Sequence, residues 1–133
     1  MGQERARARV LVVDDEPDLI RVLQFGLQAA GYVVECAADG QEGLKKARES
    51  KPDIILLDLM LPKLDGYKIC RLLKFDDRFK HIPIIILSAR TQEGDQALAL
   101  EMGANRFIAK PYEFTEILDL IEALLKESSS VRP

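Results

Sequence analysis

Five short, mostly apolar runs recur along this chain of 133 residues, and a longer segment with helix signals follows each of them. Runs of four or five such residues are typical of buried parallel strands, because helices cover both faces of a parallel sheet. The strands are expected at residues 10–14, 33–37, 54–58, 84–88 and 106–109. The strict alternation predicts an α/β fold with one five-stranded parallel sheet and helices on both faces.

The segments between the strands carry residues that begin and end helices. Pro17 suits the first turn of a helix, and Gly31 and Gly103 suit the left-handed position that ends one. The helices are expected at residues 17–30, 41–50, 66–74, 95–102 and 115–126. In the first of them, helical spacing points four residues toward the sheet, namely Ile20, Leu23, Leu27 and Ala30.

Polar side chains stand where four of these strands end. They are Asp14 and Asp15 after the first run, Asp58 after the third, Ser88 after the fourth and Lys110 after the fifth. Because the carboxyl ends of parallel strands form the edge where α/β sheets hold their active sites, we expect these side chains in one pocket. Three acids, a hydroxyl and an amine suit a divalent cation beside a phosphoryl group.

Four of these residues also have a simpler structural explanation. Asp14 and Asp15 can cap the helix that begins at Pro17. Ser88 can cap the loop after its strand, and Lys110 can be a surface lysine that begins a turn. The convergence of three acids favours the cation site, and Asp58, on the most apolar run, is the best-placed carboxylate to accept a phosphoryl group.

Composition narrows the class of protein. The chain has the length of one domain, and its formal net charge of -3 gives no support for direct nucleic-acid binding. No apolar run approaches the roughly 20 residues that cross a membrane, so we expect no membrane insertion. Cys36 and Cys70 lack metal-ligand spacing, which favours free thiols in a reducing cytoplasm. We expect a flexible arm at residues 1–8, one domain at 9–126 and a C-terminal tail or linker start at 127–133.

The motifs around the polar residues form an ordered set. They are LVVDDEP at residues 11–17, LLDLMLP at 56–62 followed by Asp65-Gly66, LSA at 87–89, and Gly103-Ala104 followed by Lys110-Pro111. In this order and spacing they resemble the response-regulator receiver domain of two-component signal transduction, over about residues 9–126. The resemblance implies the flavodoxin-like strand order 2-1-3-4-5.

The resemblance also implies a phosphoacceptor and a cofactor. Asp58 would take a phosphoryl group from a sensor histidine kinase or a histidine phosphotransfer protein. Mg²⁺ would be held by Asp15, Asp58 and the backbone carbonyl of Met60 directly, and by Asp14 mainly through water. Such a domain is not a classical enzyme, although it catalyses its own phosphorylation and slow dephosphorylation.

Three further roles follow from the same resemblance. Lys110 would pair with Asp58 at rest and with the phosphoryl oxygens afterwards, and its peptide bond to Pro111 would be cis. Ser88 would donate a hydrogen bond to the phosphoryl group, with the small Ala89 leaving room for its entry.

Phosphorylation would then change a surface that a partner can read. Phe107 would be the switch aromatic that turns inward when Ser88 moves, although an aromatic in a short strand is also an ordinary core residue. The change would remodel the surface of the fourth helix, fifth strand and last helix. A monomer or a weak phosphorylation-dependent dimer fits this picture.

Four further residues are expected to affect docking of the phosphodonor or loss of the phosphoryl group. Leu19 and Val22 fall off the sheet-facing stripe of the first helix, which predicts a docking surface for a helical phosphodonor, unless one of them lies in the core. Met60 and Arg90, each two residues after a pocket residue, are expected to tune the loss of the phosphoryl group.

Other classes of protein remain as alternatives. A pseudo-receiver or interaction module that phosphorylation does not regulate would keep the fold. A Mg²⁺-dependent aspartyl phosphatase of the haloacid-dehalogenase type needs a second acid at the position of Met60. A flavodoxin needs neutral donors for a flavin phosphate where this chain has Asp14, Asp15 and Glu16. The output partner, cognate kinase and phosphoryl lifetime are not predicted.

Overall fold

A single parallel sheet organises the computed structural model, which describes residues 8–59, 61, 63, 65–89 and 95–131. Its strands are β1 (Arg9–Val13), β2 (Val33–Ala37), β3 (Ile54–Asp58), β4 (Ile84–Ser88) and β5 (Arg106–Ala109). They are hydrogen-bonded in the order β2-β1-β3-β4-β5, and every pairing is parallel. The predicted α/β fold and its strand order are confirmed.

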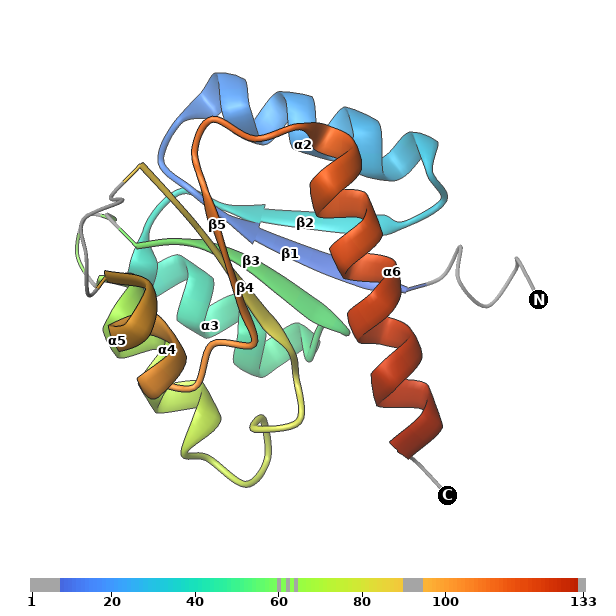
Figure 1. Cartoon of the computed structure of the whole chain (residues 1–133). Helices are drawn as coiled ribbons and strands as arrows, with labels where there is room; N and C mark the ends of the chain where they lie inside the picture. Colours follow the sequence, from blue (N-terminus) through green and yellow to red (C-terminus); the bar gives the residue numbers. More distant parts are fainter. Residues whose placement is uncertain (1–7, 60, 62, 64, 90–94, 132–133) are drawn as a thin grey trace.

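Five helices connect and cover the strands. They are α2 (Pro17–Ala29), α3 (Gly40–Ser50), α4 (Gly66–Lys74), α5 (Asp95–Glu101) and α6 (Phe114–Val131). Figure 1 shows α2 and α6 on one face of the sheet and α3, α4 and α5 on the other. This is the arrangement that right-handed crossovers between parallel strands produce.

The apolar residues of the strands alternate between two cores. Leu11 and Val13 of β1 point toward α3 and α4, whereas Val10 and Val12 point toward α2 and α6. Every residue of β3 and β4 is buried. Because both faces of these central strands are covered, their sequences are apolar without a polar face, as the prediction required.

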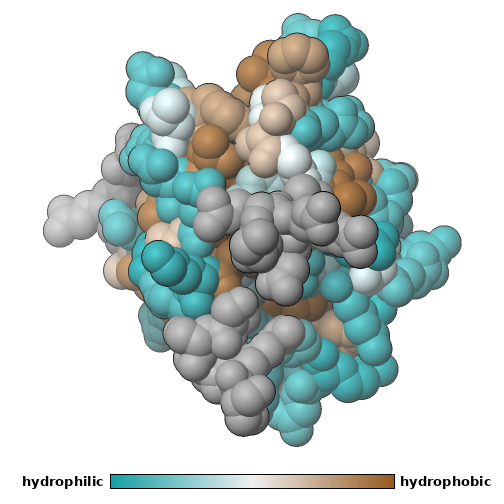
Figure 2. Space-filling model, turned by 90° about the vertical axis from the view of Figure 1, so that its right-hand side faces the viewer, coloured by the Kyte–Doolittle hydropathy of each residue, from teal (hydrophilic) through white to brown (hydrophobic). Residues whose placement is uncertain are grey.

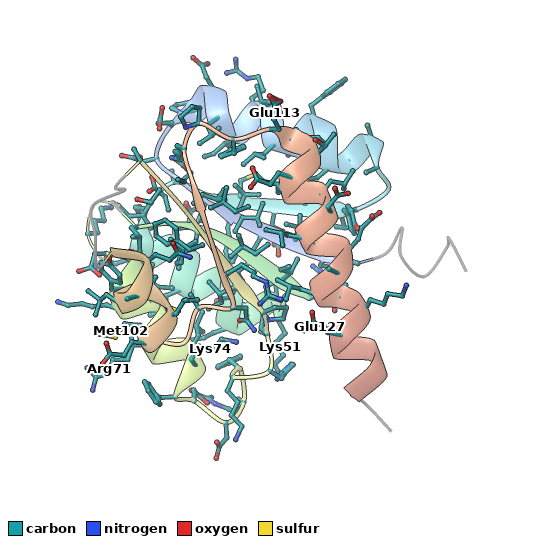
Figure 3. All side chains as sticks on the ribbon, in the orientation of Figure 1. Lys51, Arg71, Lys74, Met102, Glu113 and Glu127 are labelled. Carbon is teal, nitrogen blue, oxygen red and sulfur yellow. The ribbon has the colours of Figure 1, made fainter. Side chains whose placement is uncertain are left out.

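Side-chain hydrogen bonds are present at the ends of α3 and α4. The side chain of Asp39 accepts a hydrogen bond from the Glu42 amide (2.8 Å) at the start of α3, and Asp65 accepts one from the Lys68 amide (3.0 Å) at the start of α4. At the far end of α4, the Nζ atom of Lys74 donates to the carbonyl oxygens of Lys80 and Ile82 (3.1 and 2.8 Å). Figure 3 labels Lys74 there, well away from Glu113 at the start of α6.

Two helix predictions need correction. Ala30 is exposed and follows the last residue of α2, so helical spacing no longer points it toward the sheet. The final helix continues to Val131 rather than ending at Lys126, so residues 127–131 are helical. No helix among the described residues combines the length and apolar character needed to cross a membrane.

On the face shown in Figure 2, hydrophobic residues appear in patches between hydrophilic ones. Among the described residues, the most exposed large apolar side chains are Phe25 (76%), Phe75 (72%) and Val22 (63%). Val22 and Phe25 both belong to α2 and are three positions apart, so they lie on one side of that helix.

Candidate functional site

The site lies at the carboxyl edge of the sheet, where the register of the strands aligns the predicted polar residues. Asp58 is level with Leu87 on β4, and Ser88 is level with Ala109 on β5. Asp14 follows Val13, which is level with Leu57. The strand ends therefore bring residues from four separate stretches of the chain to one edge.

The three acids converge as predicted from their positions. Oxygen atoms of Asp14, Asp15 and Asp58 all lie within 4.8 Å of one another. Asp14 and Asp58 are buried, with exposed fractions of 1% and 6%, while Asp15 is exposed. Carboxylates this close repel each other, so the pocket favours a neutralising cation.

Lys110 supplies one positive charge inside this pocket. Its Nζ atom is 3.2 Å from Oδ2 of Asp14, 3.6 Å from Oδ2 of Asp58 and 3.6 Å from Oε1 of Glu16. The lysine side chain is only 15% exposed. The ammonium group is therefore shared between several carboxylates.

Two opposing effects act on the pKa of Lys110. Burial lowers the pKa of its amine, while the negative charges of Asp14 and then Asp58 raise it. The charges prevail, so the pKa lies above the ordinary value of lysine. The side chain is consequently a cation throughout the physiological pH range.

Backbone contacts hold the pocket residues in place. The Asp14 amide donates to the Ala37 carbonyl (3.1 Å), and the Lys110 amide donates to the Ser88 carbonyl (2.8 Å). The Glu16 amide donates to Oδ1 of Asp14 (3.0 Å), which fixes one carboxylate oxygen. Glu16 is the N-cap residue of α2, and this helix has no side-chain capping hydrogen bond, so Asp14 does not take the capping role that the simpler explanation gave it.

A glycine allows α4 to begin beside the proposed phosphoacceptor. A Cβ atom at Gly66 would lie 2.5 Å from the backbone oxygen of Asp58 and 2.8 Å from Cα of Leu59. Both neighbours are backbone atoms, so they cannot move aside cheaply. The Asp65-Gly66 motif therefore has a steric reason in this pocket.

The other residues predicted for the pocket differ in how deeply they are buried. Ser88 is fully buried at the end of β4, and Ala89 beside it is exposed. Phe107 is half-buried and packs against the core on the side of α3, α4 and α5. The peptide bond between Lys110 and Pro111 is cis, the form that the resemblance implies.

Two predicted tuning residues lie outside the described part of the chain. They are Met60, which includes the expected carbonyl ligand, and Arg90. Their expected roles remain predictions.

The two residues that were expected to form the docking surface differ in exposure. Val22 is exposed, but Leu19 is half-buried and packs against the core between the sheet and α2. Leu19 lies four positions before the buried Leu23, so both belong to one helical stripe. Leu19 is thus the member of the pair that meets the core, the alternative left open above, and its docking role stays a prediction. Phe25, which was not predicted from the sequence, is exposed beside Val22.

Two residues near the acids also escaped the sequence analysis. Glu16 pairs with Lys110, and its place directly after Asp14 and Asp15 was a signal that could have revealed it. Tyr112 follows Lys110-Pro111, and burial together with the charges of Asp14, Glu16 and Asp58 raises the pKa of its hydroxyl to about 12.

The donor set fits a divalent cation. Three carboxylates against one ammonium group leave two negative charges, and carboxylate oxygens are the ligands that Mg²⁺ prefers. Asp15 keeps the pocket in contact with solvent, from which an ion can enter. Asp14, Asp15 and Asp58 are the described residues that could hold it.

Comparisons with known proteins agree with this geometry. The family model described as the response regulator receiver domain matches residues 10–122. The chain is 42% identical over 125 residues to the alkaline phosphatase synthesis transcriptional regulatory protein PhoP of Bacillus subtilis, covering 94% of this chain and 51% of PhoP. It is 37% identical over 123 residues to the DNA-binding dual master transcriptional regulator RpaA of Synechocystis, covering 92% of this chain and 51% of RpaA. The chain thus spans about half the length of these curated relatives.

Solved structures show the same fold. A putative response regulator from Chloroflexus aurantiacus superposes with a TM-score of 0.85 at 32% identity, covering 90% of this chain and 98% of that one. A CheY-like receiver domain protein from Methanospirillum hungatei gives a TM-score of 0.88 at 26% identity, covering 93% and 98%. Together with the ordered motifs and the converging acids, these matches show that the chain belongs to the response regulator receiver domain family of two-component systems.

Proposed function

We propose that this receiver domain accepts a phosphoryl group on Asp58 from a phosphohistidine donor in the presence of Mg²⁺. The observation that carries the proposal is the convergence of Asp14, Asp15 and Lys110 on Asp58. Phosphoryl transfer asks a protein mainly for positioning and charge neutralisation, and this pocket contains groups for both.

The transfer exchanges one bond at phosphorus for another. An oxygen of Asp58 forms the new P–O bond while the P–N bond to the donor imidazole breaks, and the bonding electron pair stays on the imidazole nitrogen, which takes up a proton. Asp15, Asp58 and the expected Met60 carbonyl would hold Mg²⁺ directly and Asp14 would hold it mainly through water, and the bound ion would supply charge neutralisation at the phosphoryl oxygens.

The chain's own groups then stabilise the acyl phosphate. Lys110 already lies 3.6 Å from Asp58, so its ammonium can turn to the new oxygens without a large movement. Ser88 is at the end of the neighbouring strand, where its hydroxyl can donate to the phosphoryl group. Ala89 is small and exposed, which supports its proposed role in leaving room at the entrance.

The donor is proposed to dock on α2. Val22 and Phe25 form an exposed apolar side of this helix, next to the acids that precede it. An apolar side of this kind suits the helical bundle of a sensor kinase or phosphotransfer protein. Replacing both residues by Lys should slow transfer from a protein donor and leave a small phosphodonor unaffected; equal loss with both donors would contradict the docking role.

The output is proposed to pass through α5, β5 and α6. Phe107 is half-buried on β5, and Leu98 and Leu100 are exposed on α5 at 37% and 45%. Movement of Ser88 toward the phosphoryl group would change the packing around Phe107 and thereby this surface. Because PhoP and RpaA are described as transcriptional regulators, control of an output domain or partner is the proposed role. Unchanged amide spectra of α5 and β5 on activation would contradict the switch.

The reducing cytoplasm is the proposed location. Both cysteines are free thiols, Cys36 half-buried and Cys70 buried, which agrees with such a compartment.

The proposal is tested with phosphoramidate, whose P–N bond resembles that of phosphohistidine. We expect the intact mass to rise by one phosphoryl group with Mg²⁺ and to stay unchanged with a chelator, while Asp58→Asn should give no stable label. Absence of any label with Mg²⁺ would favour the pseudo-receiver alternative. Rapid turnover of p-nitrophenyl phosphate would favour the aspartyl phosphatase alternative.

A further inference from the structure

Tyr112 carries a buried hydroxyl group at the edge of the acidic pocket. Its ring is half-buried and packs against the core between the sheet and the pair of helices α2 and α6. The hydroxyl oxygen is buried, and among the described residues it has no hydrogen-bond partner. Buried hydroxyl groups are nearly always paired, because burying one without a partner costs free energy.

The negative charges of the acidic pocket act on this hydroxyl. The charges of Asp14, Glu16 and Asp58 act on it, and together with burial they raise its pKa to about 12. The phenol therefore keeps its proton at physiological pH and is available as a donor. Tyr112 is also tied to the pocket through the chain, since it follows Lys110 and the cis bond to Pro111.

Lys110 is the charged donor shared by these acids. Its ammonium is divided between Asp14, Glu16 and Asp58. When oxygen atoms of a phosphoryl group are attached to Asp58, they compete for that ammonium. Asp14 would then have the cation as a partner, whereas Glu16 would lose its share of Lys110 and be available to accept a hydrogen bond from another donor.

We propose that Tyr112 is a positioning residue whose hydroxyl donates a hydrogen bond to Glu16 when the pocket is loaded. The Glu16 side chain is 65% exposed, so it has the freedom to turn. The bond would link loading to the connection between β5 and α6 and to the start of α2. This inference rests on the proposed function, because it requires a loaded pocket.

The test compares Tyr112→Phe with the unmodified chain, using beryllofluoride and Mg²⁺ as the loading probe. Without the probe, the urea midpoint of Tyr112→Phe should be unchanged or higher, because an unpaired buried hydroxyl is removed. Its affinity for beryllofluoride should fall about tenfold, the size expected for a lost hydrogen bond to a charged acceptor. A lower urea midpoint with unchanged affinity would overturn the proposal, since it would show a merely structural hydroxyl.

Tyr32→Phe is the matched control. Tyr32 is buried in the same core, with 4% exposed, but it follows the C-terminal end of α2, whereas the pocket precedes the N-terminal end. The length of this helix separates them by about 20 Å. Tyr32→Phe should therefore leave the affinity for beryllofluoride unchanged; a loss equal to that of Tyr112→Phe would overturn the proposal.

A double-mutant cycle identifies the acceptor. In the Glu16→Ala background, adding Tyr112→Phe should cause no further loss of affinity for the probe. Fully additive losses would overturn the assignment of Glu16. The chain has three tyrosines and no tryptophan, so near-ultraviolet difference spectra report directly on phenol groups. Loading should produce a difference band that Tyr112→Phe lacks and Tyr32→Phe retains.

Failure of this inference is distinguishable from failure of the proposed function. If the unmodified chain binds no beryllofluoride with Mg²⁺, the proposed function fails. If it binds the probe and Tyr112→Phe binds it equally well, only the role of Tyr112 fails.

Discussion

Lys110 is the side chain that balances the acidic pocket before a metal ion binds. Its ammonium lies within 3.6 Å of Asp58 and 3.2 Å of Asp14, both buried. Removing one partner of a buried ion pair is costly, because the remaining charge has lost its compensation. The lysine therefore contributes to stability as well as to the proposed chemistry.

Replacing Lys110 by Met should expose this dual role. Without divalent ions at pH 7, the free energy of unfolding should fall by about 2 kcal/mol or more. Saturating Mg²⁺ should recover most of that loss, because a second cation then neutralises the acids. Urea denaturation measures both values, and Lys63→Met, at an ion pair that is 60% exposed on the lysine side, is the control. A loss that Mg²⁺ does not reduce would contradict this account of the charge balance.

Asp76, which is not one of the pocket residues, should make the stability of the fold depend on pH. Hydrogen bonds from the Arg78 side chain and then from its backbone amide lower the pKa of this carboxyl from 3.8 to about 2. A lowered pKa in the folded state means that the contribution to stability is complete above pH 3.8 and is lost as the pH falls toward 2. Asp76→Asn should flatten the profile of urea midpoints in that window.

Arg78→Met separates the two causes of this shift. It removes the side-chain donors but leaves the backbone amide that donates to Oδ1 of Asp76 (2.9 Å). The profile of urea midpoints against pH should therefore be flattened in part. A slope equal to that of the unmodified chain in both variants would refute the assignment.

At the scale of elements, α2 and α6 pack closely because of one small residue. A Cβ atom at Gly26 would lie 2.7 Å from Cζ of Phe114, closer than carbon atoms pack without a shift. The two helices lie together on one face of the sheet (Figure 1). Gly26 is therefore a packing residue in the middle of a helix, where glycine otherwise costs stability.

Gly26→Ala should accordingly have opposite effects on the free energy of unfolding in a chain with Phe114 and in a chain with Phe114→Leu. With Phe114 present, the added methyl group forces the ring aside, and we expect a loss of about 1 kcal/mol or more in unfolding free energy. With Phe114→Leu, the clash is relieved and the helix propensity of alanine should give a gain of up to about 1 kcal/mol. The cycle is measured by urea denaturation, and effects of equal sign in both backgrounds would contradict the packing explanation.

The elements themselves were largely predictable from the sequence. The bounds of β3 and β4 follow from runs that are apolar throughout and stop at a polar residue, Asp58 or Ser88. The convergence of Asp14, Asp15, Asp58 and Lys110 was predictable because parallel strands place their ends on one edge. The resemblance to receiver domains implied the strand order, which periodicity alone does not fix.

The errors arose where local pattern gives little information. Leu19 and Ile20 both border the apolar stripe of α2, so spacing alone did not decide which side chain meets the core. The end of α6 at Val131 was missed because Ser128, Ser129 and Ser130 resemble a linker in composition. Tyr112 was missed because its place beside the acids depends on tertiary packing rather than on a motif.

At the scale of the whole molecule, the acidic pocket should couple metal binding to folding. An ion that binds the folded state alone stabilises it, by about 1.4 kcal/mol at ten times the dissociation constant. The three carboxylates, whose oxygens lie within 4.8 Å of one another, also repel each other. Mg²⁺ should therefore raise the melting temperature in a concentration-dependent way.

Asp15→Asn should raise the stability of the chain without metal and reduce the stabilisation that Mg²⁺ gives. The variant should be more stable than the unmodified chain without metal, because repulsion is reduced, and Mg²⁺ should stabilise it less, because a ligand is lost. Asp18→Asn, at a side chain that is 97% exposed, is the control and should follow the unmodified chain. Thermal melts across a Mg²⁺ titration measure this, and an undiminished response of Asp15→Asn would argue against its role as a ligand.

The most direct test of the central claim is to locate the phosphoryl group. The chain is treated with acetyl phosphate and Mg²⁺, the acyl phosphate is reduced with borohydride to convert the labelled aspartate into homoserine, and peptides are sequenced by mass spectrometry. We predict homoserine at position 58, in place of Asp58, and none at Asp14 or Asp15. Conversion at another residue, or the absence of conversion with Mg²⁺ present, would contradict the account.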